Sequence, residues 1–132
     1  MPIRYDIDRT DRVVYLTAEG RGTHGDFEDL IDRLAEDEDF QPGMRLLCDY
    51  SKFEFNLPAD EVEEISQQMR RLSPAFTDCR LALISAGDLE YGLMRMFTLL
   101  SSEAEFETRV FRKLENAREW LGLPAVSPLN GR

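Results

Sequence analysis

The chain has 132 residues, of which 16 are lysine or arginine and 26 are aspartate or glutamate, so its formal charge at pH 7 is −10. Such an acidic surface repels phosphate backbones and anionic lipid, which argues against nonspecific binding to nucleic acid or membranes. Hydrophobic residues make up 42% of the sequence, which suits one packed domain and excludes a disordered chain.

The first half of the chain predicts a hairpin, a helix and a buried strand. Short β-prone runs at residues 4–7 and 13–18 flank a polar turn, which is typical of a hairpin. Thr23, followed three residues later by Asp26, resembles a capping box at a helix start, and apolar residues at helical spacing follow it. The largely apolar run at 44–50 predicts a central strand that is covered on both faces.

The second half continues this alternation of helices and strands. Helices are expected to begin at Asp60 and to span 88–101 and 114–121, and strands to span 79–85 and 108–112. Strands joined through helices pair in parallel, with right-handed crossovers, whereas the hairpin adds an antiparallel edge. We therefore predict an α/β fold with the order β-β-α-β-α-β-α-β-α, in which a mixed sheet of about five strands is layered with about four helices.

Domain organisation and location follow from the same reading. We expect residues 1–123 to form a single domain and residues 124–132, which contain two prolines and no periodicity, to form a flexible tail. No apolar run approaches the roughly 20 residues that span a bilayer. The start of the chain lacks the apolar stretch of a signal peptide. We therefore expect a cytoplasmic protein without a membrane span, in which Cys48 and Cys79 are buried reduced thiols.

Gly20, Gly22 and Gly25 match the G-x-G-x-x-G pattern of dinucleotide-binding loops. A turn of this kind can present backbone N–H groups to a phosphate at the start of a helix. Glu19 places a negative charge beside that position, however, and the chain is too short for the second half of a dinucleotide-binding domain. We interpret the motif as a glycine-rich turn into a helix, and whether it binds an anion stays open at this point.

The chemistry-bearing side chains do not assemble into a familiar catalytic or metal site. His24 is the single histidine, and Ser51 and Asp49 are its only candidate catalytic partners by topology. No G-x-S-x-G nucleophile elbow is present, so we expect an exposed histidine at a helix start and no enzymatic activity. With one histidine and no clustered cysteines, we also predict no metal and no cofactor.

Two apolar features favour a binding function instead. The expected core stripe of the helix at 88–101 consists of Leu89, Leu93, Met96, Phe97 and Leu100. Tyr91, Met94 and Leu99 lie off that stripe, so a second surface must cover the apolar residues on the other side of this helix. That surface is a subunit, a partner, an apolar ligand or another part of the chain such as the tail.

The second feature is the segment that follows the central strand. Phe53, Phe55 and Leu57 alternate there with polar and charged residues in an expected loop. In open α/β sheets, ligands and partners dock at the carboxyl ends of the strands, which is where this loop should lie. The alternative is that these three side chains simply pack the loop against the domain.

Several short segments, taken in order, carry a family resemblance. They are Glu19-Gly20 with Thr23-x-x-Asp26-Phe27, Pro42 to Asp49, Arg80-Leu81-Ala82, Tyr91 to Met96, Val110-Phe111, and Ala117-x-x-Trp120-Leu121. With the order of elements, they resemble the STAS fold, named for sulfate transporters and anti-sigma-factor antagonists. The sequence is most similar to the bacterial SpoIIAA-like family, which is grouped with STAS and Sec14-type domains. The resemblance spans roughly Tyr5 to Leu121.

The resemblance implies a role in regulation but not the familiar phosphorylation switch. STAS antagonists bind a kinase partner and are switched by phosphorylation of a serine at the start of the helix after the central strand. In this chain that position falls near Leu57 and Pro58, which carry no hydroxyl, and Ser51 lies about seven residues too early. We therefore expect no classical phospho-switch.

Together these observations predict a non-enzymatic regulatory or protein-interaction domain. The expected partner is another protein or a second copy of the chain in a homodimer. We expect no nucleic-acid partner. The alternative is a binder of a small apolar or lipid-like ligand, with the helix at 88–101 as a methionine-lined wall. The residues expected to form the partner or ligand surface are Phe53, Phe55, Asn56, Leu57, Asp60, Tyr91, Met94 and Arg95.

Overall fold

The computed structural model describes residues 2–55 and 57–124, and the predicted tail lies outside the described residues except for Pro124. The predicted order of strands and helices is confirmed, with one short 3-10 helix in addition. The elements are β1 (Ile3–Asp8), β2 (Val13–Gly22), α1 (His24–Glu36), β3 (Arg45–Phe55), α2 (Ala59–Arg71), η1 (Ser73–Phe76), β4 (Arg80–Ile84), α3 (Asp88–Leu100), β5 (Glu107–Phe111) and α4 (Leu114–Trp120).

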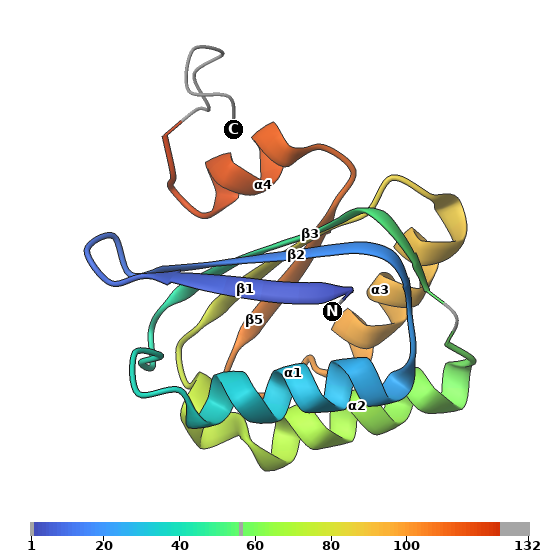
Figure 1. The fold of residues 1–132 in the computed structure, drawn as a ribbon, viewed down its shortest axis with the longest axis horizontal. Coiled ribbons are helices and arrows are strands. Elements are labelled where there is room, and N and C mark those ends of the chain that lie inside the picture. The colour runs from blue at the N-terminus through green and yellow to red at the C-terminus, as the bar shows by residue number, and fades with distance from the viewer. Residues whose placement is uncertain (1, 56, 125–132) are drawn as a thin grey trace.

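The five strands form one mixed sheet in the order β1-β2-β3-β4-β5. The hairpin strands β1 and β2 pair antiparallel, and every later neighbour pairs in parallel. Because the strands follow one another in sequence order, right-handed crossovers place the three connecting helices on the same face. Figure 1 shows α1, α2 and α3 on this face and α4 on the opposite one. No helix in the described ranges is long and apolar enough to cross a bilayer.

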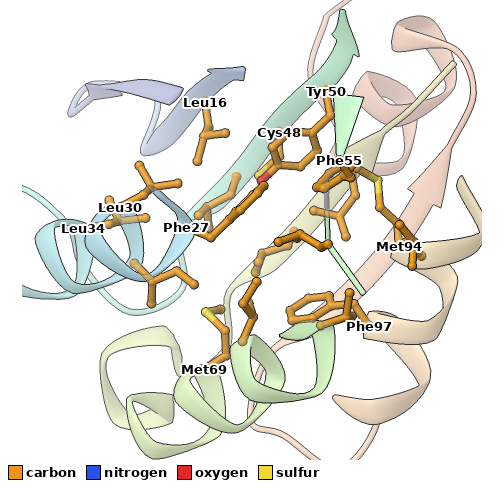
Figure 2. Close-up of a pocket in the computed structure, with 18 of the residues that line it drawn as sticks. Leu16, Phe27, Leu30, Leu34, Cys48, Tyr50, Phe55, Met69, Met94 and Phe97 are labelled. Carbon is orange, nitrogen blue, oxygen red and sulfur yellow. The ribbon is translucent and has the colours of Figure 1, made fainter. Parts of the chain in front are cut away.

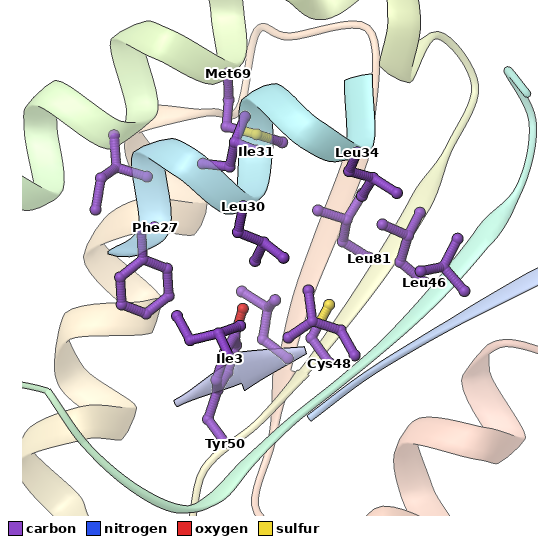
Figure 3. Packing of buried hydrophobic residues seen from close by; sticks show 14 of the residues in the cluster. Ile3, Phe27, Leu30, Ile31, Leu34, Leu46, Cys48, Tyr50, Met69 and Leu81 are labelled. Atoms are coloured by element: carbon purple, nitrogen blue, oxygen red, sulfur yellow. The ribbon is translucent and has the colours of Figure 1, made fainter. Parts of the chain in front are cut away.

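Each face of the sheet has its own apolar core. The larger core lies between the sheet and the three helices, where Leu30 and Leu34 of α1 point toward Leu46 and Leu81 of the strands (Figure 3). The smaller core lies under α4 and is centred on Ala82, which is fully buried. Burying a leucine side chain contributes about 1.5–3 kcal/mol, so the larger core supplies most of the apolar stabilisation.

The start of α1 is fixed by the predicted capping box, which is confirmed. The Thr23 side chain accepts a hydrogen bond from the Asp26 backbone N–H, at 3.4 Å. In return the Asp26 carboxylate accepts the Thr23 backbone N–H at 2.8 Å. Because this carboxylate occupies the helix start, the place where a nucleotide phosphate would sit already holds a negative group.

The strands β2 and β3 are longer than the sequence predicts, and a β-bulge lies within their pairing. Thr17 pairs with Asp49 and Glu19 with Lys52, so two residues of β3 lie opposite one residue of β2. A bulge of this kind interrupts the alternation of side chains between the two faces of a sheet. Without the bulge, the even-numbered side chains of β3, such as that of Tyr50, would face the helices along the whole strand. The odd-numbered side chains after Tyr50 would then point away from the helices.

Two sequence-based expectations are therefore corrected. The segment from Gly20 to Gly22 is the paired end of β2 and not a turn, and Phe53 and Phe55 lie on β3 and not in a loop. Glycine is required at position 22 because a Cβ there would overlap the ring of Phe53. The motif that resembles a phosphate loop thus has a packing role in this strand pair.

The buried face of α3 also differs from the expected one. Leu89, expected in the core, is 67% exposed, whereas Met94, expected off the stripe, is only 4% exposed. Leu93 and Phe97 do pack against the core as predicted. A helix that is apolar around most of its circumference has no unique buried face in its sequence pattern. The orientation of α3 follows instead from its packing against α2 and β5.

Candidate functional site

An apolar cavity of about 100 Å³ lies between the sheet and helices α1, α2 and α3. Both the strands and the three helices contribute side chains to its wall. Examples are Leu16 of β2, Leu30 of α1, Cys48 of β3, Met69 of α2 and Met94 of α3. Figure 2 shows these side chains converging from the strands and the helices. The cavity therefore lies within the larger core, in a place where the layers do not completely fill the space between them.

Among the described residues, only the Cys48 thiol and the Tyr50 hydroxyl bring polar side-chain atoms to this wall. Burial raises the pKa of Cys48 to about 12. Burial also raises the pKa of Tyr50 well above its ordinary value, and the nearby Cys48 thiol adds to this effect. Both groups are consequently neutral at physiological pH, so the cavity holds no thiolate nucleophile and no charge. Both cysteines are free and buried, so the predicted burial is confirmed.

Four aromatic rings form a cluster at one end of the cavity. Phe27 of α1 stacks on Phe55 with centroids 5.4 Å apart and meets Phe53 edge-on at 5.7 Å. Tyr50 completes the cluster, 6.1 Å from Phe53. The bulge in β3 and the bare Gly22 make this arrangement possible, because together they bring all three rings of β3 to the helix side. The cluster stabilises the end of the strand pair that extends beyond β4.

The wall formed by α3 is the least tightly packed. Met94 is its one fully buried side chain, whereas Leu93 and Phe97 line the cavity and keep part of their surface in water. By contrast, α1 buries four side chains over the same helix length. A helix held by fewer buried contacts separates from the domain at a lower free-energy cost. The cavity can therefore enlarge on the α3 side.

The structure divides the predicted surface residues into two groups. Phe53 and Leu57 are buried, at 4% and 7% exposure, so they do not lie on an open docking surface. Three residues meet at the cavity instead: Phe55, Leu57 and Met94. Asp60 is exposed in the first turn of α2, and Asn56 lies outside the described residues.

The other group lies on the opposite side of α3, facing the edge strand. Tyr91 and Arg95 line a groove between α3 and β5 that is separate from the cavity. The Arg112 guanidinium lies 4.2 Å from the centre of the Tyr91 ring. The predicted residues thus mark two places in the fold, an apolar interior and a polar groove, where the sequence had suggested one surface.

His24 does not meet the two partners that the sequence suggested for it. Its Nδ1 lies 3.6 Å from Glu28 and its Nε2 lies 3.5 Å from Glu64, so the ring links α1 to α2. Among the described residues, no hydrogen bond joins it to Ser51 or Asp49. The Asp49 carboxylate instead accepts the Ser51 backbone N–H at 2.9 Å. His24 is half-buried and not exposed as expected, because the side chain of Glu64 approaches it from α2.

Several wall residues were missed as functional candidates, although the sequence predicts them as core. Phe27, Leu30 and Met69 fall on the apolar faces of their helices, and nothing in a periodic pattern separates a core residue from a cavity-lining one. One signal was available in β3, where Tyr50, Phe53 and Phe55 break strict alternation. Such a break is typical of a bulge that directs an additional ring to one face.

Comparisons with known proteins agree with this architecture. The family model described as SpoIIAA-like matches residues 13–122. The chain is also similar to the crystal structure of an uncharacterized protein of the DUF3478 family with a SpoIIAA-like fold from Shewanella loihica PV-4. That similarity has a TM-score of 0.57 and 22% sequence identity, and it covers 90% of this chain and 93% of the other. No protein of curated function matches the chain.

Proposed function

The chain belongs to the SpoIIAA-like family, and from that premise we propose that it is a non-enzymatic binding domain for a small apolar ligand. The observation that carries this proposal is the cavity between the sheet and α1, α2 and α3, whose wall is apolar apart from two neutral polar groups. A ligand suited to it is a short hydrocarbon chain or a ring with at most one hydrogen-bonding group. The Tyr50 hydroxyl and the Cys48 thiol are the available partners for that group.

The size of the cavity supports binding on energetic grounds. An empty space in a core costs about 24 cal/mol per Å³, so about 2 kcal/mol is stored here and returned when the space is filled. An engineered apolar cavity of about 150 Å³ stays dry and binds benzene. The present cavity of about 100 Å³ accepts a slightly smaller group in its closed form. A longer chain requires outward movement of α3, and the half-buried Leu93 and Phe97 permit that movement.

A homologous series of 1-alkanols from butanol to decanol tests this proposal. Binding is measured from amide shift changes in ¹⁵N–¹H spectra of the uniformly labelled protein. Each methylene that becomes buried contributes about 0.8 kcal/mol, so affinity should rise about fourfold per carbon until the cavity is full and then level off. Shift changes should be strongest around Leu30 and Met94.

Val62 of α2 lines the cavity and offers a matched variant. Val62→Ile adds one methylene to the wall, so the affinity should level off about one carbon earlier in the series. Glu63→Gln, on the exposed side of the same helix, serves as the control and should leave the series unchanged. A steady rise in affinity with no plateau, or shifts spread over the exposed surface, indicates adsorption and contradicts the proposal.

A protein partner is the second candidate, and the exposed side chains of α3 favour it. Among the described residues, Leu89 and Leu99 are the two large apolar residues that are exposed, at 67% and 70%, and both lie on this helix. A homodimer through this helix stays a prediction that sedimentation equilibrium measures. The two candidates are compatible, because the ligand would occupy the inner side of α3 and the partner its outer side.

A further inference from the structure

The strand β5 has one free hydrogen-bonding edge. The Glu107 N–H donates to the Cys79 carbonyl oxygen, and the Phe111 carbonyl oxygen accepts from the Ser85 N–H, so these odd-numbered residues of β5 are bonded toward β4. In a parallel ladder the residues between them direct their N–H and C=O groups to the other side. Among the described residues no strand pairs with that side. The backbone groups of Thr108 and Val110 are therefore available to an additional strand.

A groove of about 290 Å³ follows this free edge, between β5 and α3. On the helix side it is lined by Tyr91, Arg95 and Leu99, which occur at intervals of four residues and form one row. Four helical residues rise about 6 Å, and two strand residues span roughly 6.6 Å. Alternate side chains of a strand added to β5 would therefore lie opposite the three members of this row.

The charge of the groove is opposite to that of the molecule. In the part of the chain that the structure describes, neither Arg95 nor Arg109 has an ion-pair partner. Both border the groove, and the Arg109 guanidinium lies 5.5 Å from the centre of the Phe111 ring, which packs against the core under α4. Arg112, at the end of the strand, pairs with Asp88 at 2.9 Å and covers the Tyr91 ring. A protein with a net charge of −10 thus keeps two unpaired arginines beside an open strand edge.

We propose that the free edge of β5 docks an extended segment of another protein, in which one acidic side chain lies between apolar side chains at alternate positions. The acidic group would pair with Arg95, and the two apolar groups would contact Tyr91 and Leu99. Strand addition of this kind obtains affinity from the backbone and specificity from the alternate side chains. A segment with many acidic residues fits less well, because the charge of −10 on the whole chain repels it.

A second copy of this chain is a poorer occupant of the same edge. Antiparallel pairing of two β5 strands about a two-fold axis would bring the arginines of both copies together across the interface. Like charges placed opposite one another destabilise a strand pair. Arg95 and Arg109 therefore favour a partner of complementary charge over self-association.

The test uses the capped heptapeptide TVTETVT as the probe and TVTKTVT as its charge-reversed control. Both are titrated into the ¹⁵N-labelled full chain. We expect the amides of Thr108 and Val110 to shift and TVTETVT to bind roughly twofold to fivefold more tightly, which is the effect of one exposed ion pair. Arg95→Glu should reverse this preference. Equal binding of both peptides, or shifts away from β5, overturns the proposal.

Thr108 offers a second, independent variant. Thr108→Pro removes an N–H that points away from β4, so it should leave the sheet intact and abolish peptide binding. Thr108→Val keeps the N–H and should bind as the original chain does. If the Thr108 and Val110 amides shift on concentrating the protein alone, or on adding phosphatidylglycerol vesicles in place of peptide, the occupant is a second copy or a lipid surface and the proposal is wrong.

Discussion

At the scale of single residues, the contact between Tyr5 and Asp37 ties β1 to the end of α1. The Tyr5 hydroxyl donates to the Asp37 carboxylate at 2.7 Å. This hydrogen bond is the main reason that the pKa of Asp37 is below its ordinary value of 3.8. Partial burial, followed by the bond to Asp37, raises the pKa of Tyr5 to about 12. The pair therefore makes the stability of the edge hairpin depend on pH at both extremes.

Tyr5→Phe should lower the free energy of unfolding by about 1 kcal/mol at neutral pH, because it removes a hydrogen bond to a charged group at a partly exposed site. A lowered carboxyl pKa stabilises the folded state above the unfolded pKa of about 4 and loses that effect as the pH falls further. The difference between the two proteins should therefore shrink in acid.

The raised pKa of Tyr5 sets the alkaline limit of this stabilisation. The neutral hydroxyl stabilises the folded state fully below pH 10, and the stabilisation is lost as the pH rises toward about 12. Urea unfolding at several pH values measures both limits. Tyr15→Phe is the control, because among the described residues its hydroxyl makes no hydrogen bond. An equal loss in both variants, or a loss independent of pH, contradicts the assigned role of the pair.

At the scale of elements, α1 and α3 provide a comparison within one molecule, since each has 13 residues and both cover the same face of the sheet. α1 buries four side chains, whereas α3 buries Met94 alone. A helix with fewer buried contacts opens locally at a lower free-energy cost. Amides of α3 should therefore exchange with solvent at least about tenfold faster than those of α1. Adding 1-octanol should slow exchange in α3 and leave α1 unchanged.

Hydrogen exchange read by NMR or mass spectrometry measures this difference. Equal protection of the two helices contradicts the account of α3 as the weakly held wall. Protection by 1-octanol that is spread evenly over the whole sheet indicates general stabilisation, and it contradicts filling of a cavity beside α3.

The elements were predictable because their signals are local, whereas the buried faces of β3 and α3 were not. A capping box at Thr23 and apolar periodicity fix the start and the buried face of α1 without reference to other parts of the chain. The bulge opposite Ala18 depends on pairing between distant strands, so the sequence pattern placed Phe53 in a loop. For α3 the periodicity was ambiguous, and Leu89 and Met94 exchanged the roles expected of them.

The candidate site was less predictable than the fold, for a related reason. The sequence pattern predicts Met94 and Phe55 as surface residues, yet they line an interior space that exists only when three helices pack on one sheet face. Tyr91 and Arg95 are close to Met94 in sequence, although the helix directs them to a different groove. Grouping by sequence therefore joined two places that the fold separates.

At the scale of the whole molecule, the sequential strand order explains where the cavity lies. All three crossover helices cover one face, and the layer they form must span five strands. The opposite face is covered by the shorter α4 and has a smaller core. An incompletely filled space is thus located under the thicker layer, where outward movement of α3 adjusts its volume.

A crystal structure of the chain with 8-bromo-1-octanol tests the binding of an apolar ligand in the cavity, because anomalous scattering locates the bromine. We expect one bromine site in the space enclosed by Leu30, Met69 and Phe97, together with an outward shift of α3. Bromine found only at exposed positions such as Leu89 or Leu99, with the cavity unchanged, would contradict the binding of an apolar ligand in this domain.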